Sequence, residues 1–261
     1  MSTPAPDIAV PAAVAARAAG RRITPVWRND LGGITFRLGD DEYIKWMPTQ
    51  TPELDFDAEA VRLRWAQPHV TVPRVIARGS SDGAEWLVTA AIAGTSAIDP
   101  RWADSPAIAA RAIGAGLRHL HDTLPVHVCP FDWSVSARTV GLTPAERAAL
   151  GPTPPIDRLV VCHGDACAPN TLVGEDGRFA GHVDLGSLGT ADRWADLAVA
   201  AMSLDWNFDQ PRPDVLFEAY GVAPDEARLA FYRRVWKNLE LHESRLAANA
   251  APNLDDPREP A

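Results

Sequence analysis

Two short polar clusters joined by a predicted β-hairpin constrain the fold of this chain more than any other feature. The first cluster, His163-Gly164-Asp165-Ala166-Cys167-Ala168-Pro169-Asn170, follows Arg158 to Cys162, a run that is typical of a buried strand. The second cluster, Val183-Asp184-Leu185-Gly186, ends a hairpin whose turn signal is Glu175-Asp176-Gly177-Arg178. The hairpin sets the two clusters in register with each other.

These clusters contain the groups that phosphoryl transfer requires. One carboxylate orients the attacking hydroxyl and accepts its proton, while carboxylate and amide oxygens hold Mg²⁺ on the phosphates. Asp165 precedes Asn170 by five positions, which is the spacing of the protein-kinase catalytic loop, and Asp184 stands where the kinase D-F-G aspartate would. Two motifs in this order indicate a phosphotransferase more strongly than either motif alone.

The part of the chain before the clusters carries residues that suit the nucleotide side of such a site. Lys45 lies on a predicted strand and Glu59 on the helix that follows, which matches the Lys–Glu pair that positions the nucleotide phosphates in kinases. Leu31-Gly32-Gly33 lies on a turn where glycine lets backbone N–H groups approach phosphate. Tyr43 is two residues before Lys45, so it should share a sheet face with the lysine and can stack on a nucleobase.

Short β-rich runs followed by longer helical runs predict an α+β fold with two lobes. The first lobe, residues 1–92, should contain a small antiparallel sheet and one helix, and the second lobe, residues 93–250, should be mainly helical. The Pro-rich end, residues 251–261, is predicted to be a disordered tail. The predicted strands are Ile34–Leu38, Tyr43–Met47, Val72–Ala77, Glu85–Thr89, Arg158–Cys162, Thr171–Val173 and Phe179–Val183, and the predicted helices are Leu54–Trp65, Ile108–Leu124, Thr143–Glu146, Ala191–Leu204 and Asp225–Leu246.

The charge balance argues against a polyanionic partner. The chain carries 25 Lys and Arg against 34 Asp and Glu, a formal net charge of −9, and it shows no local basic patch. We therefore expect no nucleic-acid partner, and the sign of the charge suits a cationic ligand. No membrane span is expected because no apolar stretch reaches about 18 residues, and no obligate protein partner is indicated.

The cysteines indicate a reducing compartment. Their odd number fits no disulfide framework, and their spacing fits no structural zinc site. The Ala/Val-rich N-terminal stretch has no basic region before it and is interrupted by three prolines and an aspartate, so we expect no signal peptide and a cytoplasmic location. The three cysteines are Cys129, Cys162 and Cys167.

Together the clusters resemble the aminoglycoside phosphotransferase family, above all the aminoglycoside 3′-phosphotransferases and the streptomycin 3″-phosphotransferases. The resemblance rests on the cluster around Asp165 and on residues 183–196, and it spans roughly Val26 to Tyr232. It implies a two-lobed fold similar to protein kinases, an ATP or GTP donor, Mg²⁺, and a cationic antibiotic whose hydroxyl accepts the phosphoryl group, which confers resistance. The residues are compatible with ATP and GTP alike.

The resemblance also implies a role for each site residue. Asp165 is the expected catalytic base, with Asn170 and Asp184 as metal ligands. The expected nucleotide contacts are Lys45 paired with Glu59, Tyr43 on the adenine, Gly33 on the phosphate side, and the main chain near Thr89 and Ala91.

Three polar residues beside the clusters are predicted to be structural. His163 precedes Gly164 directly and has no second histidine or cysteine at metal-ligand spacing, so we expect it to hold the loop by hydrogen bonds. Asp192 and Asp196 lie four positions apart on a predicted helix and are expected to act as caps and loop anchors.

The chain departs from the family pattern where the acceptor binds. The 3′ class typically ends in Asp-Glu-Phe-Phe, whereas residues 236–239 read Trp-Lys-Asn-Leu here, and residues 125–156 are shorter and poorer in acids than the helical insert of the family. The sequence therefore leaves the identity of the acceptor molecule open. The first alternative is a kinase of another small hydroxylated metabolite or antibiotic, and the second is a catalytically dead nucleotide-binding protein, against which the intact Asp165 and Lys45 argue.

Overall fold

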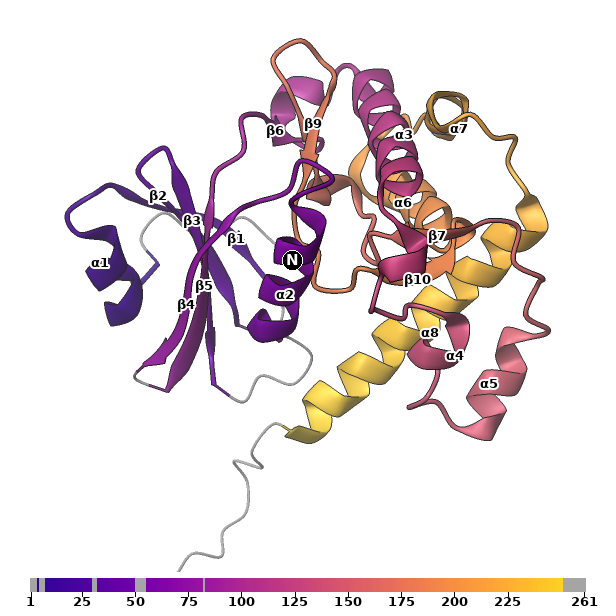
Figure 1. Cartoon of the computed structure of the whole chain (residues 1–261), viewed down its shortest axis with the longest axis horizontal. Helices are drawn as coiled ribbons and strands as arrows, with labels where there is room; N and C mark the ends of the chain where they lie inside the picture. The colour runs from indigo at the N-terminus through magenta and orange to yellow at the C-terminus, as the bar shows by residue number, and fades with distance from the viewer. Residues whose placement is uncertain (1–3, 5–7, 30–31, 50–54, 82, 251–261) are drawn as a thin grey trace, which may run out of the picture.

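A computed structural model describes residues 4, 8–29, 32–49, 55–81 and 83–250, with side chains to residue 239. These residues form a small sheet lobe and a larger, mainly helical lobe (Figure 1). The predicted α+β architecture is confirmed. The predicted disordered tail lies outside the described residues, as does Leu31 of the predicted glycine turn.

The first lobe is built on a five-stranded antiparallel sheet with the strand order β1-β2-β3-β5-β4. The predicted hairpin joins β2 to β3, and Gly39 supplies the positive φ of 60° in its turn. Strand β1 is not predicted from the sequence, because Pro25 interrupts it and the register of the pairing shifts there. The strands are β1 (Ile23–Arg28), β2 (Ile34–Leu38), β3 (Glu42–Pro48), β4 (Val75–Ser81) and β5 (Ala84–Ala90).

The alternation of side chains along β3 determines where the functional residues of this lobe lie. Ile44 packs in the apolar cluster that includes α1 (Ala12–Ala18), at the outer side of the sheet (Figure 1). Met47 packs in the cluster that includes α2 (Phe56–Ala66), on the side toward the helical lobe. Lys45 is two residues from Met47 and therefore shares this inner face.

The second lobe packs its helices around one large apolar core, to which α3, α6, α7 and α8 contribute. Within the described residues, none of the helices combines the length and the apolar character needed to cross a membrane. The helices are α3 (Pro106–Thr123), α4 (Val135–Arg138), α5 (Pro144–Leu150), α6 (Trp194–Asn207), α7 (Pro213–Tyr220) and α8 (Glu226–Ala250), with 3₁₀ turns η1 (Pro100–Trp102), η2 (Val126–Val128) and η3 (Ala168–Asn170). The strands are β6 (Thr95–Ser96), β7 (Leu159–Cys162), β8 (Thr171–Val173), β9 (Phe179–His182) and β10 (Gly189–Asp192).

The chain after the second cluster differs from the prediction. The sequence predicts a helix from Ala191, but this residue pairs with Val160 in the ladder of β10 and β7. Helix α6 starts only at Trp194, whose N–H donates to the side chain of Asp192 at 3.3 Å. The predicted start of the helix is wrong because a short strand leads into the helix through the single turn residue Arg193, with no glycine or proline to mark the boundary.

Candidate active site

The loop after β7 carries the first predicted cluster and is held against the second. Gly164 has a φ of 88°, and a Cβ there would lie 2.0 Å from the Ser187 carbonyl oxygen, so glycine alone fits. Nε2 of His163 donates to the Val183 carbonyl oxygen at 3.0 Å. His163 thus makes the kind of structural contact that the sequence predicts for it.

Asp165 and Asn170 contact each other directly. The Nδ2 group of Asn170 donates to Asp165 Oδ2 at 2.9 Å and to the Asp165 carbonyl oxygen at 3.0 Å. The second carboxylate oxygen, Oδ1, is buried and accepts no hydrogen bond from the described residues, although the thiol of Cys167 lies close enough to lower the pKa of the carboxyl. Asn170 therefore fixes one oxygen of Asp165, and the other is left to accept from a ligand.

The β8–β9 hairpin brings Asp184 to Asn170. Thr171 pairs with His182, and the Val183 N–H donates to the Asn170 carbonyl oxygen at 3.0 Å. Asp184 follows with a φ of 64°, a left-handed conformation that is uncommon for a residue with a Cβ. Backbone strain of this kind gathers at functional positions, and it falls on a predicted metal ligand here.

Lys45 joins the two lobes because it contacts both Glu59 and Asp184. Its Nζ lies 2.7 and 2.9 Å from the two carboxylate oxygens of Glu59 and 2.8 Å from Oδ1 of Asp184. Glu59 sits in the first turn of α2, which is capped by the Asp55 side chain accepting from the Ala58 N–H at 2.9 Å. The sequence predicts the pairing with Glu59, whereas the contact with Asp184 emerges from the structure.

These contacts shift the pKa values of the four charged groups in different directions. Burial raises the pKa of Glu59, and burial together with the charge of Asp184 raises the pKa of Asp165. Burial also opposes the ionisation of Asp184, but Lys45 outweighs it and lowers the pKa of this carboxyl. The two carboxylates likewise overcome burial and raise the pKa of Lys45. Asp165 is thus a stronger proton acceptor than Asp184.

The predicted base contacts lie next to one another at the end of the sheet. Tyr43 of β3 pairs with Thr89 of β5. The Ala91 N–H already donates to the Asp41 carbonyl oxygen at 2.8 Å. The Ala91 N–H is therefore already engaged within the sheet lobe.

The Gly33 N–H, which is predicted to lie on the phosphate side, has a partner within the chain. That N–H donates to the Asn29 side chain at 2.6 Å, and the Asn29 N–H donates back to the Gly33 carbonyl oxygen at 3.0 Å. A Cβ on Gly33 would lie 2.8 Å from Asn29 Nδ2. The glycine is explained by close packing against Asn29, which sequence reasoning did not foresee.

Helix α6 holds the loop that carries Asp165 at two points. The Asp196 carboxylate accepts from the His163 N–H at 2.6 Å and from the Gly164 N–H at 3.0 Å, as a loop anchor would. Two turns later, Ser203 Oγ accepts from the Ala168 N–H at 2.8 Å. Sequence reasoning missed Ser203 because one serine in an apolar helix carries no distinguishing pattern.

His182 gives the protein a predictable pH dependence of stability. Burial, together with the nearby His163, lowers the pKa of this imidazole to about 3. Between pH 3 and the unfolded value of about 6.5 the unfolded chain binds the extra proton, so stability falls as the pH falls. We expect the free energy of unfolding to decrease by about 1 kcal/mol per pH unit more in the wild type than in His182→Leu between pH 6.5 and 5. Urea unfolding curves measure both slopes, and equal slopes would contradict the shift.

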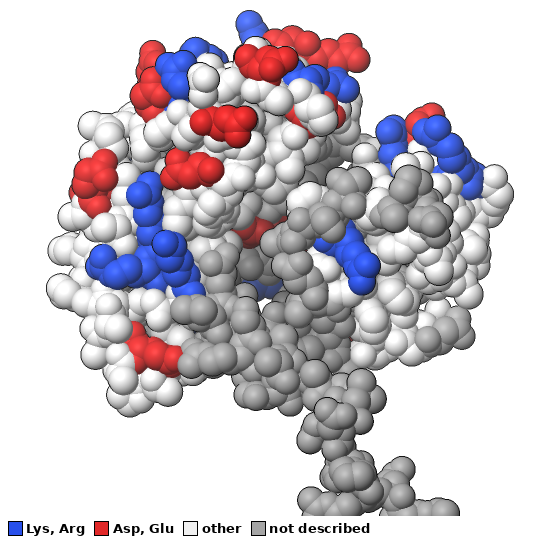
Figure 2. Space-filling view, turned by 180° about the vertical axis from the view of Figure 1, so that it is seen from behind, with Lys and Arg blue, Asp and Glu red and all other residues white. Residues whose placement is uncertain are grey.

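The surface is hollowed between the two lobes. Seen from behind, acidic and basic side chains are visible deep in this hollow (Figure 2). A separate pocket of about 740 Å³ lies between segments 129–136 and 147–156 and includes Tyr232 of α8. Asp165 does not line it, and Leu159 and Asp192, at the far ends of β7 and β10, do. Lys45 and Asp184, which contact each other across the lobes, do not line this pocket either.

The amino-acid sequence of this chain is similar to those of known phosphotransferases. Residues 35–232 match the model of the phosphotransferase enzyme family. The chain is 36% identical over 239 residues to an aminoglycoside 3′-phosphotransferase of Streptomyces ribosidificus, with 78% of this chain and 90% of the relative covered. It is 34% identical over 243 residues to a streptomycin 3″-kinase of Streptomyces griseus, with 79% and 88% covered.

Solved structures of related enzymes are similar to most of this chain. The crystal structure of an aminoglycoside 3′-phosphotransferase of type VIII has a TM-score of 0.68 and 29% identity, with 84% of this chain and 93% of that chain covered. Aminoglycoside phosphotransferase APH(3″)-Id of Streptomyces rimosus, in complex with ADP and streptomycin, has a TM-score of 0.63 and 26% identity, with 86% and 95% covered. The predicted kinase-like architecture is confirmed by these neighbours.

Proposed function

This chain belongs to the phosphotransferase enzyme family, and we propose that it transfers the γ-phosphoryl group of ATP or GTP to a hydroxyl of an aminoglycoside or aminocyclitol antibiotic. The observation that carries the proposal is the carboxylate of Asp165, with Oδ2 fixed by Asn170 and Oδ1 buried without a partner among the described residues. The product carries about −1.5 to −2 additional charge, which confers resistance by altering the drug where its target recognises it.

In the proposed reaction, the acceptor hydroxyl donates its hydrogen bond to Oδ1 of Asp165. The hydroxyl oxygen forms a bond to the γ-phosphorus, the bond from that phosphorus to the β–γ bridging oxygen breaks, and the proton passes to the Asp165 carboxylate. Lys45 holds the α- and β-phosphates, and Glu59 holds Lys45. Most of the rate enhancement comes from positioning and electrostatics.

The oxygen atoms around Asp184 suit Mg²⁺. Oδ1 of Asn170 and Oδ2 of Asp184 accept no hydrogen bond from the described residues, since Asn170 uses Nδ2 toward Asp165 and Asp184 uses Oδ1 toward Lys45. Hard oxygen donors are the ligands that Mg²⁺ prefers. Asn170 and Asp184 would therefore hold the ion, which when bound neutralises charge on the phosphates.

We place the acceptor beside the C-terminal end of α6. Ser203 holds the catalytic loop, and Trp206 lies three residues further, about 4.5 Å along the helix axis. Trp206 is 52% exposed, and Asp205, the residue before it, is also exposed. A sugar ring can stack on the indole while an ammonium group meets the carboxylate.

We propose that the reaction takes place in the cytoplasm, where a nucleoside triphosphate donor is supplied. None of the three cysteines forms a disulfide, which suits a reducing compartment.

A coupled assay for nucleoside diphosphate release tests the proposal with Mg²⁺, ATP or GTP, and a panel of aminoglycosides, streptomycin, aminocyclitols and small uncharged alcohols. We expect turnover with at least one cationic antibiotic, and a narrower acceptor range than in the 3′ class because Trp-Lys-Asn-Leu replaces the acidic end at residues 236–239. Turnover of an uncharged metabolite, together with no turnover of any aminoglycoside at millimolar concentration, would contradict the proposal.

The placement of the acceptor has its own test. Asp205→Asn should raise the acceptor KM about three- to fivefold at low salt, and the difference should shrink at higher ionic strength because exposed charges are screened. Asp214→Asn is the matched control, because the Asp214 carboxylate is already paired with Arg212 at 3.0 and 2.8 Å. Equal acceptor KM values for the two variants would show that Asp205 does not contribute to the acceptor site.

A further inference from the structure

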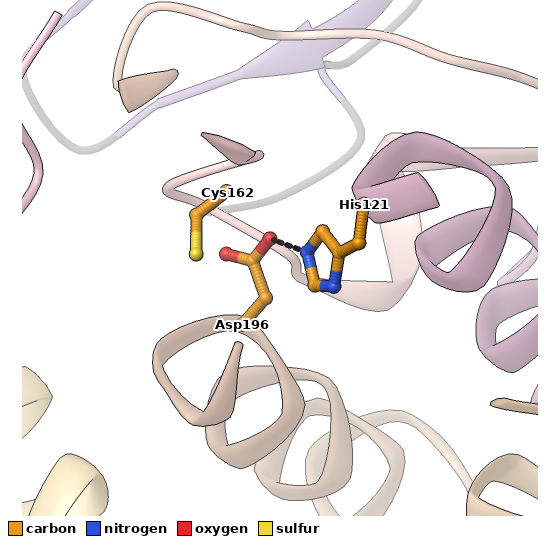
Figure 3. Close-up of side chains that lie close together, drawn as sticks. All are labelled: His121, Cys162 and Asp196. Carbon is orange, nitrogen blue, oxygen red and sulfur yellow. Dashed lines mark hydrogen bonds and ion pairs between the residues drawn. The ribbon is translucent and has the colours of Figure 1, made fainter. Parts of the chain in front are cut away.

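Behind the catalytic loop lies a buried group of three side chains that the reaction itself does not use. His121 comes from α3, Asp196 from α6 and Cys162 from the end of β7, and their polar atoms lie within 4.8 Å of one another (Figure 3). Burial raises the pKa of the Cys162 thiol well above its ordinary value, so it is not the thiolate that a metal requires. Nε2 of His121 and Oδ2 of Asp196 are already bonded to each other at 3.0 Å. His121 and Asp196 therefore belong to a hydrogen-bond network, whereas the Cys162 thiol donates to the Asp192 carbonyl oxygen at 3.5 Å.

The network runs from α7 to the catalytic loop. The Tyr220 hydroxyl lies 2.9 Å from Nδ1 of His121, and burial raises the pKa of this tyrosine to about 12, so the hydroxyl keeps its hydrogen. Because a carboxylate can only accept, Nε2 of His121 carries the hydrogen that is donated to Asp196. The same oxygen, Oδ2, accepts from the His163 N–H at 2.6 Å, and Oδ1 accepts from the Gly164 N–H at 3.0 Å.

We propose that His121 is a positioning residue for phosphoryl transfer, acting through the orientation of the Asp196 carboxylate. His121 and Asp196 are 2% and 1% exposed, so water does not replace a lost donor. Without the Nε2 hydrogen, the carboxylate is free to rotate toward other donors, and one of its two contacts with the loop is lost. Gly164 is bonded directly to Asp165, so the displacement passes to the catalytic carboxylate, and shifts of about 1 Å cost up to 100-fold in rate. This inference rests on the proposed role of Asp165.

Two conservative variants separate the two contacts of His121. In His121→Gln the amide nitrogen reaches the position of Nε2 and retains the donor to Asp196. In His121→Asn the shorter amide reaches only the position of Nδ1, so it retains Tyr220 and loses Asp196. We expect kcat within threefold of the wild type for the Gln variant, and a loss of roughly 10- to 100-fold for the Asn variant with the nucleotide KM changed less than twofold.

Tyr220→Phe is the matched control, because it removes the other hydrogen-bond partner of the same ring. It should keep kcat within threefold, since the donor to Asp196 remains. Equal losses in His121→Asn and Tyr220→Phe, or wild-type kcat in the Asn variant together with unchanged hydrogen exchange in the loop, would overturn the proposal. If His121→Asn does not fold, His121→Met takes its place, because methionine fills the volume of the ring without a donor. A folded Gln variant that loses more than tenfold in kcat would also overturn it.

Hydrogen exchange distinguishes this inference from the proposed function. In nucleotide-free protein, the amides of residues 163–165 should exchange at least tenfold faster in the Asn variant than in the Gln variant, while α3 amides outside the substituted turn stay unchanged. Unchanged exchange in the loop would overturn the positioning role. Faster exchange with wild-type kcat would instead overturn the role of Asp165 in the reaction.

Discussion

Asp165→Asn is expected to lose kcat by about three orders of magnitude while its nucleotide affinity stays nearly constant. The new side chain has almost the same volume, and its carbonyl oxygen can still accept from Nδ2 of Asn170. The position of Oδ1, which accepts no hydrogen bond from the described part of the chain, is then taken by an NH₂ group that cannot receive the acceptor proton. Measuring kcat and the nucleotide Kd on one preparation checks both halves of this expectation.

Asp176→Asn is a suitable control for Asp165→Asn. It removes the same charge from the exposed turn of the β8–β9 hairpin, where the Asp176 side chain accepts only from the Arg178 N–H among the described residues. We expect its kcat to stay within twofold of the wild type. Near-wild-type turnover in Asp165→Asn would remove Asp165 as the base, and a joint loss of nucleotide binding would make it a ligand of the nucleotide or its metal.

The residues that sequence analysis located correctly are those whose geometry is fixed by local structure. Asp165 and Asn170 lie on one short loop, and the hairpin pairing of Thr171 with His182 carries Asp184 back to them. The loop and the hairpin are both short, so the spacing in the sequence was enough to predict that these three residues lie close together. Lys45 and Glu59 were found for a related reason, since a strand and the helix that follows it pack against each other.

The contacts that sequence analysis missed depend on packing between distant elements. His121, Tyr220 and Ser203 reach the catalytic loop or its anchor through the arrangement of α3, α7 and α6, which no periodicity encodes. The prediction that Gly33 lies on the phosphate side rests only on its being a glycine in a turn. Its N–H donates to the side chain of Asn29, four residues earlier, and the residue types alone do not distinguish such a contact from a phosphate loop.

Lys45→Ala should raise the nucleotide KM and lower kcat, with a combined loss of about three to four orders of magnitude in kcat/KM. The lysine contacts Glu59 and Asp184 at once, so its removal takes away a phosphate contact and also leaves two carboxylates without their shared cation. Glu59 is only 5% exposed, and an unpaired buried charge costs about 3 kcal/mol of stability. Steady-state kinetics and thermal unfolding on the same variant measure the two effects.

The pH dependence of that stability loss identifies its cause. Burial already raises the pKa of Glu59, and without Lys45 this carboxyl takes up a proton more readily. Because its folded pKa then lies above its unfolded value, its protonated form stabilises the fold at low pH and the benefit is lost as the pH rises. We therefore expect Lys45→Ala to be destabilised less at pH 5 than at pH 8.

The double variant Lys45→Met/Glu59→Leu separates the stability of the pair from its function. Replacing a buried ion pair by apolar side chains of similar volume is often neutral or stabilising, so the double variant should unfold near the wild-type temperature and yet remain as inactive as Lys45→Ala. Glu59→Gln should lose only about tenfold in kcat, since Lys45 keeps its contact with Asp184 and loses only part of its orientation. A stable double variant with wild-type kinetics would show that Lys45 serves to neutralise Glu59 and that the nucleotide is held by other groups.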